Sequence, residues 1–171
     1  MDSDYAESDK ASSKSRTGYV FMIAGGPVVW KSALQPVVAQ SSCEAEYVAA
    51  NAAARTAEWV RLINDDLGVG ELLADPVDLE GAQAGKRPVL LWCDNQATIA
   101  LSKNFMVSHA TKHIRVRFHY IRQQIRDGII RLQYVPTDVN LADCFTKCLA
   151  YVKFAQHRDL LVKEPIGLAR K

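Results

Sequence analysis

The sequence predicts an α/β fold in one domain, and three observations lead to that class. Residues 17–25 and 27–32 have strand character on either side of a glycine-rich turn. Residues 44–67 have the composition of a long helix, and residues 88–94 form a continuous apolar run of strand length. The chain has 171 residues, of which 49% are hydrophobic, and this is enough for one buried core.

Composition excludes a membrane-spanning protein and a disulfide scaffold. No apolar run approaches the roughly 18–20 residues that a membrane span needs, and the polar, acidic start differs from a signal peptide. The four cysteines lack paired Cys-x-x-Cys spacing and are too few for a disulfide-rich domain. We therefore expect reduced thiols, an intracellular protein and no membrane partner.

The first expected elements are a polar arm and an antiparallel hairpin. The first residues have no apolar periodicity, so we expect a loop there and ordered structure from about Thr17. Valine, phenylalanine, tyrosine and tryptophan give the next two segments β-branched and aromatic character. Gly25, Gly26 and Pro27 separate these segments and are interpreted as the turn of the hairpin.

A long alanine-rich helix is expected next. Residues 44–67 contain no glycine or proline, Gly68 marks the end, and the alanines would allow close packing on a sheet. Ser41 and Glu44 have the spacing of a capping box, which assigns Glu44 to helix capping. Glu46 lies about half a turn deeper, so we expect Glu46 to carry the chemistry.

The expected change from strand to helix after residues 88–94 indicates a catalytic role for Asp94. Residues 69–86 are interpreted as a surface loop, and residues 95–103 have helical character. In open α/β sheets, functional groups gather beyond the carboxyl ends of the strands, where Asp94 would lie. The alternative is that Asp94 only caps the following helix.

A basic segment follows, because residues 96–126 contain no aspartate or glutamate. On a helix that starts near Lys112, Arg115, Arg122 and Arg126 recur at helical spacing and could face a phosphate backbone. An ordinary solvated helix face is the alternative.

The last part of the chain adds a strand and a helical region. Asp127 and Gly128 form a turn signal, residues 129–135 have strand character, and a last helical region begins near Val139. Asp143 falls in the first turn of that region, where an aspartate can simply complement the helix dipole.

Asp2, Glu46, Asp94 and Asp143 together suggest a nuclease. Carboxylates held within a few ångströms repel one another and raise one another's pKa unless a divalent cation is bound among them. Mg²⁺ takes oxygen ligands and shares substrate phosphate oxygens. Two such ions could activate a water and stabilise the leaving oxygen of a phosphodiester.

Several segments also carry a family resemblance. In chain order they are DSDYA, SRTGYVFMIAGGPVVWKSALQPVVAQSSCEAEYVA, WCDNQATIAL, TKHIRVRFHYIR and YVPTDVNLADCFTK. From Asp2 to about Leu161, the chain resembles the ribonuclease H domain of copia-type LTR retrotransposon Pol polyproteins. The resemblance implies an RNase H-like fold, a mixed five-stranded sheet flanked by helices, with the first, central strand largely truncated here.

The implied activity is an endoribonuclease that hydrolyses the RNA strand of RNA/DNA hybrids during reverse transcription. Two Mg²⁺ ions, with Mn²⁺ as a substitute, are the implied cofactors. The resemblance matches Asp2, Glu46 and Asp94 to direct metal ligands, and Asp143 to a residue that completes one metal site. Asp4 and Glu44 are the second choices.

The substrate contacts and domain limits are expected as follows. The residues that would contact the hybrid are Ser41, Ser42, Asn95, Gln96, Lys112, His113 and Arg117. Residues 1–16 would be the remnant of the first strand and a flexible loop. Residues 17–161 would form the RNase H-like domain, and residues 162–171 would be a C-terminal tail.

The resemblance also implies partners and leaves alternatives. The partners would be the RNA/DNA hybrid and the reverse transcriptase domain upstream in the same polyprotein, in a cytoplasmic retrotransposon particle or in the nucleus. A polynucleotidyl transferase would need a late glutamate, whereas here the glutamate is second and an aspartate is last. The remaining alternative is a catalytically inactive or host-adopted RNase H-like fragment that binds nucleic acid.

Overall fold

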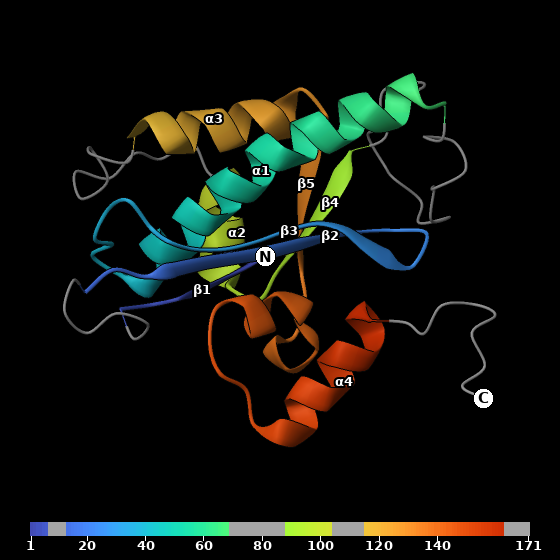
Figure 1. The fold of residues 1–171 in the computed structure, drawn as a ribbon. Coiled ribbons are helices and arrows are strands. Elements are labelled where there is room, and N and C mark those ends of the chain that lie inside the picture. Colours follow the sequence, from blue (N-terminus) through green and yellow to red (C-terminus); the bar gives the residue numbers. More distant parts are fainter. Residues whose placement is uncertain (7–12, 69–87, 104–114, 163–171) are drawn as a thin grey trace.

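The computed structural model describes residues 1–6, 13–68, 88–103 and 115–162, which form a mixed α/β fold (Figure 1). The strands and helices, in chain order, are β1 (Asp2–Asp4), β2 (Arg16–Ile23), β3 (Gly26–Leu34), α1 (Ser42–Asp66), β4 (Val89–Cys93), α2 (Gln96–Lys103), α3 (Arg115–Arg126), β5 (Ile130–Tyr134) and α4 (Tyr151–Leu161). Two short 3-10 helices, η2 (Thr137–Val139) and η3 (Leu141–Phe145), lie between β5 and α4.

The described strands form two hydrogen-bonded groups. β1, β2 and β3 make an antiparallel sheet in that order, and β4 pairs in parallel with β5. The amino group of Met1 donates to the carbonyl oxygen of Trp92 at 2.8 Å, so the start of β1 lies beside the end of β4. One mixed five-stranded sheet was expected, whereas the ladder hydrogen bonds divide the described strands into a three-stranded antiparallel sheet and a parallel pair.

The helices cover two sides of the strands. In Figure 1, α1 and α3 lie on one side, and α4 with the 3-10 helices lies on the opposite side. Alanines at positions 45, 49, 50, 53, 54 and 57 of α1 are almost fully buried, which confirms the expected close packing. Because alanine has no bulky side chain, α1 packs directly on β1, β2 and β4.

The hairpin is confirmed, but its turn lies earlier than expected. Ile23 pairs with Gly26, so the two turn residues are Ala24 and Gly25, whose φ angles are 50° and 76°. Positive φ at both central residues is the backbone of a turn that matches the twist of the flanking strands. Gly26 and Pro27, which we expected in the turn, belong to β3 instead.

The helix after β5 also differs from the prediction. A single helical region from Val139 was expected, whereas the chain makes η2 and η3 and then starts α4 at Tyr151. Asn140 accepts a hydrogen bond from the backbone N–H of Ala142 and donates to the carbonyl oxygen of Met1. This side chain therefore ties η3 to the N-terminal strand, a long-range contact that periodicity does not reveal.

The expected loop before Thr17 is wrong at its start, because Asp2–Asp4 pair with β2 as the strand β1, whereas two helix ends agree closely with the predictions. The helix at residues 44–67 corresponds to α1, which ends before Gly68, and Gly68 has a φ of 65°. Gly128 has the same left-handed backbone between α3 and β5. Residues 69–86, interpreted as a loop, lie outside the described residues. Among the helices that the structure describes, none is both long and apolar enough to span a membrane.

Candidate metal centre

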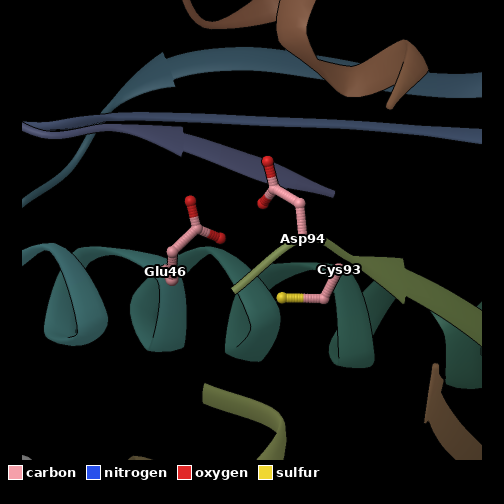
Figure 2. A group of neighbouring side chains, drawn as sticks. All are labelled: Glu46, Cys93 and Asp94. Carbon is pink, nitrogen blue, oxygen red and sulfur yellow. The ribbon is translucent and has the colours of Figure 1, made fainter. Parts of the chain in front are cut away.

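The four predicted carboxylates converge on one place from four separate segments. Oxygen atoms of Asp2, Asp94 and Asp143 lie within 4.8 Å of one another. A second group, in which the ligand atoms also lie within 4.8 Å, contains Glu46, Asp94 and the sulfur of Cys93 (Figure 2). Asp94 belongs to both groups and therefore joins them into one centre.

The first strand and the first helix fix two of these carboxylates. Asp2 is in β1, whose residues pair with β2, and its side chain is buried. Glu46 is in the second turn of α1 and is also buried. The backbone N–H of Ser3 donates to Oε1 of Glu46 at 2.8 Å. The strand therefore holds one oxygen of the glutamate directly.

The start of α2 shows that Asp94 is not the helix cap. The side chain of Asn95 accepts a hydrogen bond from the backbone N–H of Thr98 at 2.9 Å, which is the capping interaction. Asp94 follows directly after β4, and its carboxylate points toward Glu46 in Figure 2. The capping alternative for Asp94 is therefore wrong.

The helix η3 brings in the fourth carboxylate, which is surrounded by polar groups from the residues after η3 and from α4. Asp143 is completely buried and forms ion pairs with Lys147 at 3.4 Å and with Lys153 at 2.7 Å. The hydroxyl of Thr146 donates to the carboxylate of Asp2. Because Asp143 is completely buried and pairs with two lysines, it is more than a helix-dipole residue.

Both lysines place positive charge at the edge of the centre. Nζ of Lys147 also lies 3.9 Å from Asp2. Burial opposes ionisation of Lys147, but the charges of Asp2 and Asp143 outweigh it and raise its pKa. Lys147 therefore stays protonated and offsets part of the repulsion between these two aspartates.

Ionisation is strongly opposed at the buried glutamate, first by burial and then by repulsion. Burial raises the pKa of Glu46 well above its ordinary value, and the charges of Asp2 and Asp94 raise it further. Burial likewise raises the pKa of Asp2, although the hydrogen bond from Thr146 opposes this shift. Ionisation of the centre is thus unfavourable until a cation is bound among the carboxylates.

The donor atoms fit divalent cations. Oε2 of Glu46 and Oδ1 of Asp143 are buried and have no hydrogen-bond partner among the described residues, although Oδ1 lies near Lys147. The other oxygen of each is held, by the N–H of Ser3 and by Lys153 respectively. Each side chain therefore has one fixed oxygen, and the second oxygen of Glu46 is available to a metal, whereas that of Asp143 is paired, within the described part of the chain, only with Lys147. Carboxylate oxygens are the ligands that Mg²⁺ prefers.

Gly18 makes the approach of η3 to β2 possible. In the register of the sheet, Gly18 is opposite Asp2. A Cβ at position 18 would lie 2.6 Å from Cγ2 of Thr146, and 3.0 Å from both the carbonyl oxygen of Ala142 and Cβ of Phe145. Two of these contacts involve backbone or Cβ atoms, which have little freedom to move.

We expect Gly18→Ala to lower the free energy of unfolding by about 1–3 kcal/mol, the usual cost of overpacking. The added methyl group would push η3, and with it Asp143, away from Asp2. Urea unfolding checks the stability. Gly26→Ala is the matched control, since its Cβ would meet nothing closer than 3.9 Å. Equal stability of Gly18→Ala and the unsubstituted chain would contradict this packing.

Several residues of the centre were missed by sequence reasoning. They are Cys93, Thr146, Lys147 and Lys153. Lys147 follows Asp143 by four residues, and this spacing was a usable signal. Cys93 directly precedes Asp94, and neighbouring strand residues normally point to opposite faces, so its presence beside the same carboxylates was unexpected.

The predicted substrate residues lie in three places. Ser41 and Ser42 are exposed at the start of α1, where Ser41 caps the helix by accepting from the N–H of Glu44. Asn95 and Gln96 begin α2 next to Asp94. These four residues are close in sequence to the candidate ligands Glu46 and Asp94, and their contact with a substrate stays a prediction.

The remaining substrate predictions concern the basic segment. Lys112 and His113 lie outside the described residues, and Arg117 is half-buried in α3, which packs on α1, α2 and β5. The proposed basic stripe is only partly supported, because Arg122 is buried and donates to the carbonyl oxygen of Leu101 at 3.1 Å. Arg122 therefore has a structural role and does not face a phosphate backbone.

The second-choice carboxylates lie outside both ligand groups. Oε2 of Glu44 accepts a hydrogen bond from the N–H of Gln40 at 2.8 Å, directly before the cap residue Ser41, so Glu44 supports the helix start as predicted. Asp4 is opposite Arg16 in the pairing of β1 with β2. The geometry favours Glu46 over Glu44 and Asp2 over Asp4.

Comparisons with known proteins find similar sequences in transposons. The chain is 35% identical over 168 residues to the retrovirus-related Pol polyprotein from transposon TNT 1-94 of Nicotiana tabacum, which covers 96% of the chain and 11% of that polyprotein. It is 31% identical over 153 residues to the corresponding polyproteins from transposons RE1 and RE2 of Arabidopsis thaliana, covering 90% of the chain and 9% and 10% of those polyproteins.

The chain thus spans about a tenth of the length of the curated relatives that it matches. No family model and no solved structure matches it. The similarity covers 90–96% of the chain, which therefore belongs to the family of transposon Pol polyproteins.

Proposed function

We propose that this chain is the ribonuclease H domain of a retrotransposon Pol polyprotein and hydrolyses the RNA strand of RNA/DNA hybrids. The observation that carries the proposal is the convergence of Asp2, Glu46, Asp94 and Asp143 around the shared residue Asp94. The similarity to transposon Pol polyproteins supports it. A reverse transcriptase domain of the same polyprotein, which makes such hybrids, would be the partner.

The four carboxylates would hold two Mg²⁺ ions. Asp2, Asp94 and Asp143 would bind one, and Glu46 and Asp94 would bind the other, with Asp94 shared. Bound in this way, the ions would activate a water and stabilise the leaving oxygen of the phosphodiester.

The protein's own contribution is to fix these ligands before the hybrid arrives. Ser3 orients Glu46, Thr146 orients Asp2, and Lys153 orients Asp143. Side chains already held in position need no rearrangement during the reaction, which is the usual benefit of a preorganised site. Lys147, which is partly exposed beside Asp2 and Asp143, would also attract the phosphate backbone.

Cleavage of labelled duplexes tests the proposal. The purified chain should cut the RNA strand of an RNA/DNA hybrid in Mg²⁺ and not in EDTA. Double-stranded DNA and double-stranded RNA of the same sequence should stay intact, because the activity requires one strand of each kind. Binding of the hybrid without cleavage in either Mg²⁺ or Mn²⁺ would instead support a non-catalytic nucleic-acid-binding fragment.

A further inference from the structure

The centre contains a sulfur ligand that a Mg²⁺ nuclease does not need. Cys93 is the last residue of β4, and its side chain is completely buried. Its Sγ and carboxylate oxygens of Glu46 and Asp94 all lie within 4.8 Å of one another. Figure 2 shows the three side chains approaching the same space from α1 and from the end of β4.

A second observation points to a ligand in this space. Glu46 is only 5% exposed, and its Oε2 has no hydrogen-bond partner among the described residues. A buried carboxylate oxygen without a partner is costly, since the charged form loses its hydration. Binding of a cation next to Oε2 would remove this cost.

The chemistry of the three donors favours a particular class of cation. Mg²⁺ prefers an all-oxygen environment, whereas thiolates select softer metals such as Zn²⁺. Zn²⁺ binds both cysteine sulfur and carboxylate oxygen, and its open four-coordinate sites hold three protein ligands and a water. We propose that Glu46, Cys93 and Asp94 form a site for a thiophilic divalent cation, Zn²⁺ or Cd²⁺, that overlaps the Mg²⁺ centre.

Binding must convert the thiol of Cys93 into a thiolate. Burial raises the pKa of Cys93 to about 12, and the charge of Glu46 raises it further, so the thiol carries its proton when no metal is bound. On coordination, the S–H bond breaks and the proton passes to a buffer base. The sulfur electron pair then forms the metal–sulfur bond, and no oxidant or reductant is required.

The site would oppose the proposed nuclease activity. A thiophilic ion bound by Glu46 and Asp94 occupies two ligands of the Mg²⁺ centre, so the two kinds of ion compete. This consequence rests on the proposed function, whereas binding of the ion itself does not. Zn²⁺ should therefore inhibit cleavage in the presence of Mg²⁺, and Cys93 should set the sensitivity.

Binding is tested with Cd²⁺ alone, because its bond to a thiolate gives an ultraviolet charge-transfer band. The parent variant carries Cys43→Ser, Cys144→Ser and Cys148→Ser, so Cys93 is its one thiol. It should bind one Cd²⁺ per chain and show the band. Adding Cys93→Ser, or Cys93→Ala as a second variant, should abolish the band while circular dichroism shows that the fold is retained.

The carboxylate part of the site is tested in the same parent. Glu46→Gln should weaken Cd²⁺ binding by at least about tenfold, the lower limit expected when groups that support a metal are lost. Glu58→Gln is the matched control on the same helix, where the carboxylate accepts a hydrogen bond from Tyr120 and lies outside the group. It should leave binding unchanged.

Three results would overturn the proposal: no band in the parent, a band that persists without Cys93, or equal Cd²⁺ affinity of Glu46→Gln and its control. None of these measurements requires nuclease activity, so an inactive chain that binds Cd²⁺ would refute the proposed function and leave this site standing. In an active chain, the Cys93→Ser variant should need at least about tenfold more Zn²⁺ than the unsubstituted chain to lose half of its cleavage rate. Each rate is taken relative to the rate of the same protein without Zn²⁺.

Discussion

Asp94→Asn is expected to reduce Mg²⁺-dependent hybrid cleavage by about 10²–10³-fold or more, the range seen when one preorganised electrostatic group is removed. The effect should be this large because Asp94 is the one carboxylate shared by both ligand groups. Asparagine keeps the shape of the side chain and removes its charge, so both ions would be bound more weakly. Initial rates on a hybrid with labelled RNA measure the effect.

Asp138→Asn is the matched control for this substitution. Asp138 is exposed in η2 and lies outside both ligand groups, so its replacement should leave the cleavage rate unchanged. Thermal unfolding shows whether Asp94→Asn keeps its fold. Cleavage by a folded Asp94→Asn at the unsubstituted rate would exclude Asp94 as a ligand of the reacting centre.

Glu46→Gln is expected to stabilise the metal-free protein at pH values above the raised, folded-state pKa of Glu46, and to remove the stabilisation by Mg²⁺. The charged Glu46 is buried, lies near Asp2 and Asp94, and has one oxygen without a partner. The neutral amide removes this repulsion and can donate to a neighbouring carboxylate. The expected gain in the free energy of unfolding is about 1–3 kcal/mol, the cost of a buried group that lacks its partner.

The pH dependence of stability separates this effect from a general change in packing. The folded protein raises the pKa of Glu46, so between the unfolded and folded pKa values the folded state binds more protons. The stabilising contribution of the protonated group is therefore fully present below its ordinary pKa of 4.5 and is lost as pH rises through the folded value. Stability in EDTA should fall with rising pH over this window, and less steeply in Glu46→Gln.

Thermal unfolding in EDTA and in Mg²⁺, over a series of pH values, gives both results. Glu58→Gln, on the same helix, should change neither the pH slope nor the stabilisation by Mg²⁺. A Glu46→Gln variant that is less stable than the unsubstituted protein at every pH, or is stabilised by Mg²⁺ to the same extent, would contradict a strained metal-ligand role for Glu46.

Local signals in the sequence predicted the elements that carry Glu46 and Asp94. Ser41 and Glu44 mark a helix start by a pattern that spans four residues, and the resulting helix fixes the position of Glu46. An apolar run that ends in Asp94 identifies the end of a strand in the same way. Because such features depend on residues that are neighbours in the sequence, the sequence alone is enough to predict them.

The features of the site that the sequence did not predict depend on contacts between residues far apart in the chain. Lys153 reaches Asp143 from α4, and the amide of Asn140 binds the backbone of Met1 across almost the whole chain. The turn at Ala24 was misplaced because glycine and proline at the next positions give a stronger composition signal than alanine. Cys93 was given no role at the site, since strand alternation alone does not describe the last residue before a chain leaves the sheet.

Counting bound Mn²⁺ by electron paramagnetic resonance tests most directly whether the four carboxylates form one centre for two cations. The unsubstituted chain should bind two Mn²⁺ ions, the number expected for a centre of this kind. Asp94→Asn should lose affinity for both ions together, because Asp94 is a member of both ligand groups. No binding of Mn²⁺ by the unsubstituted chain, or undiminished binding by Asp94→Asn, would contradict the shared centre.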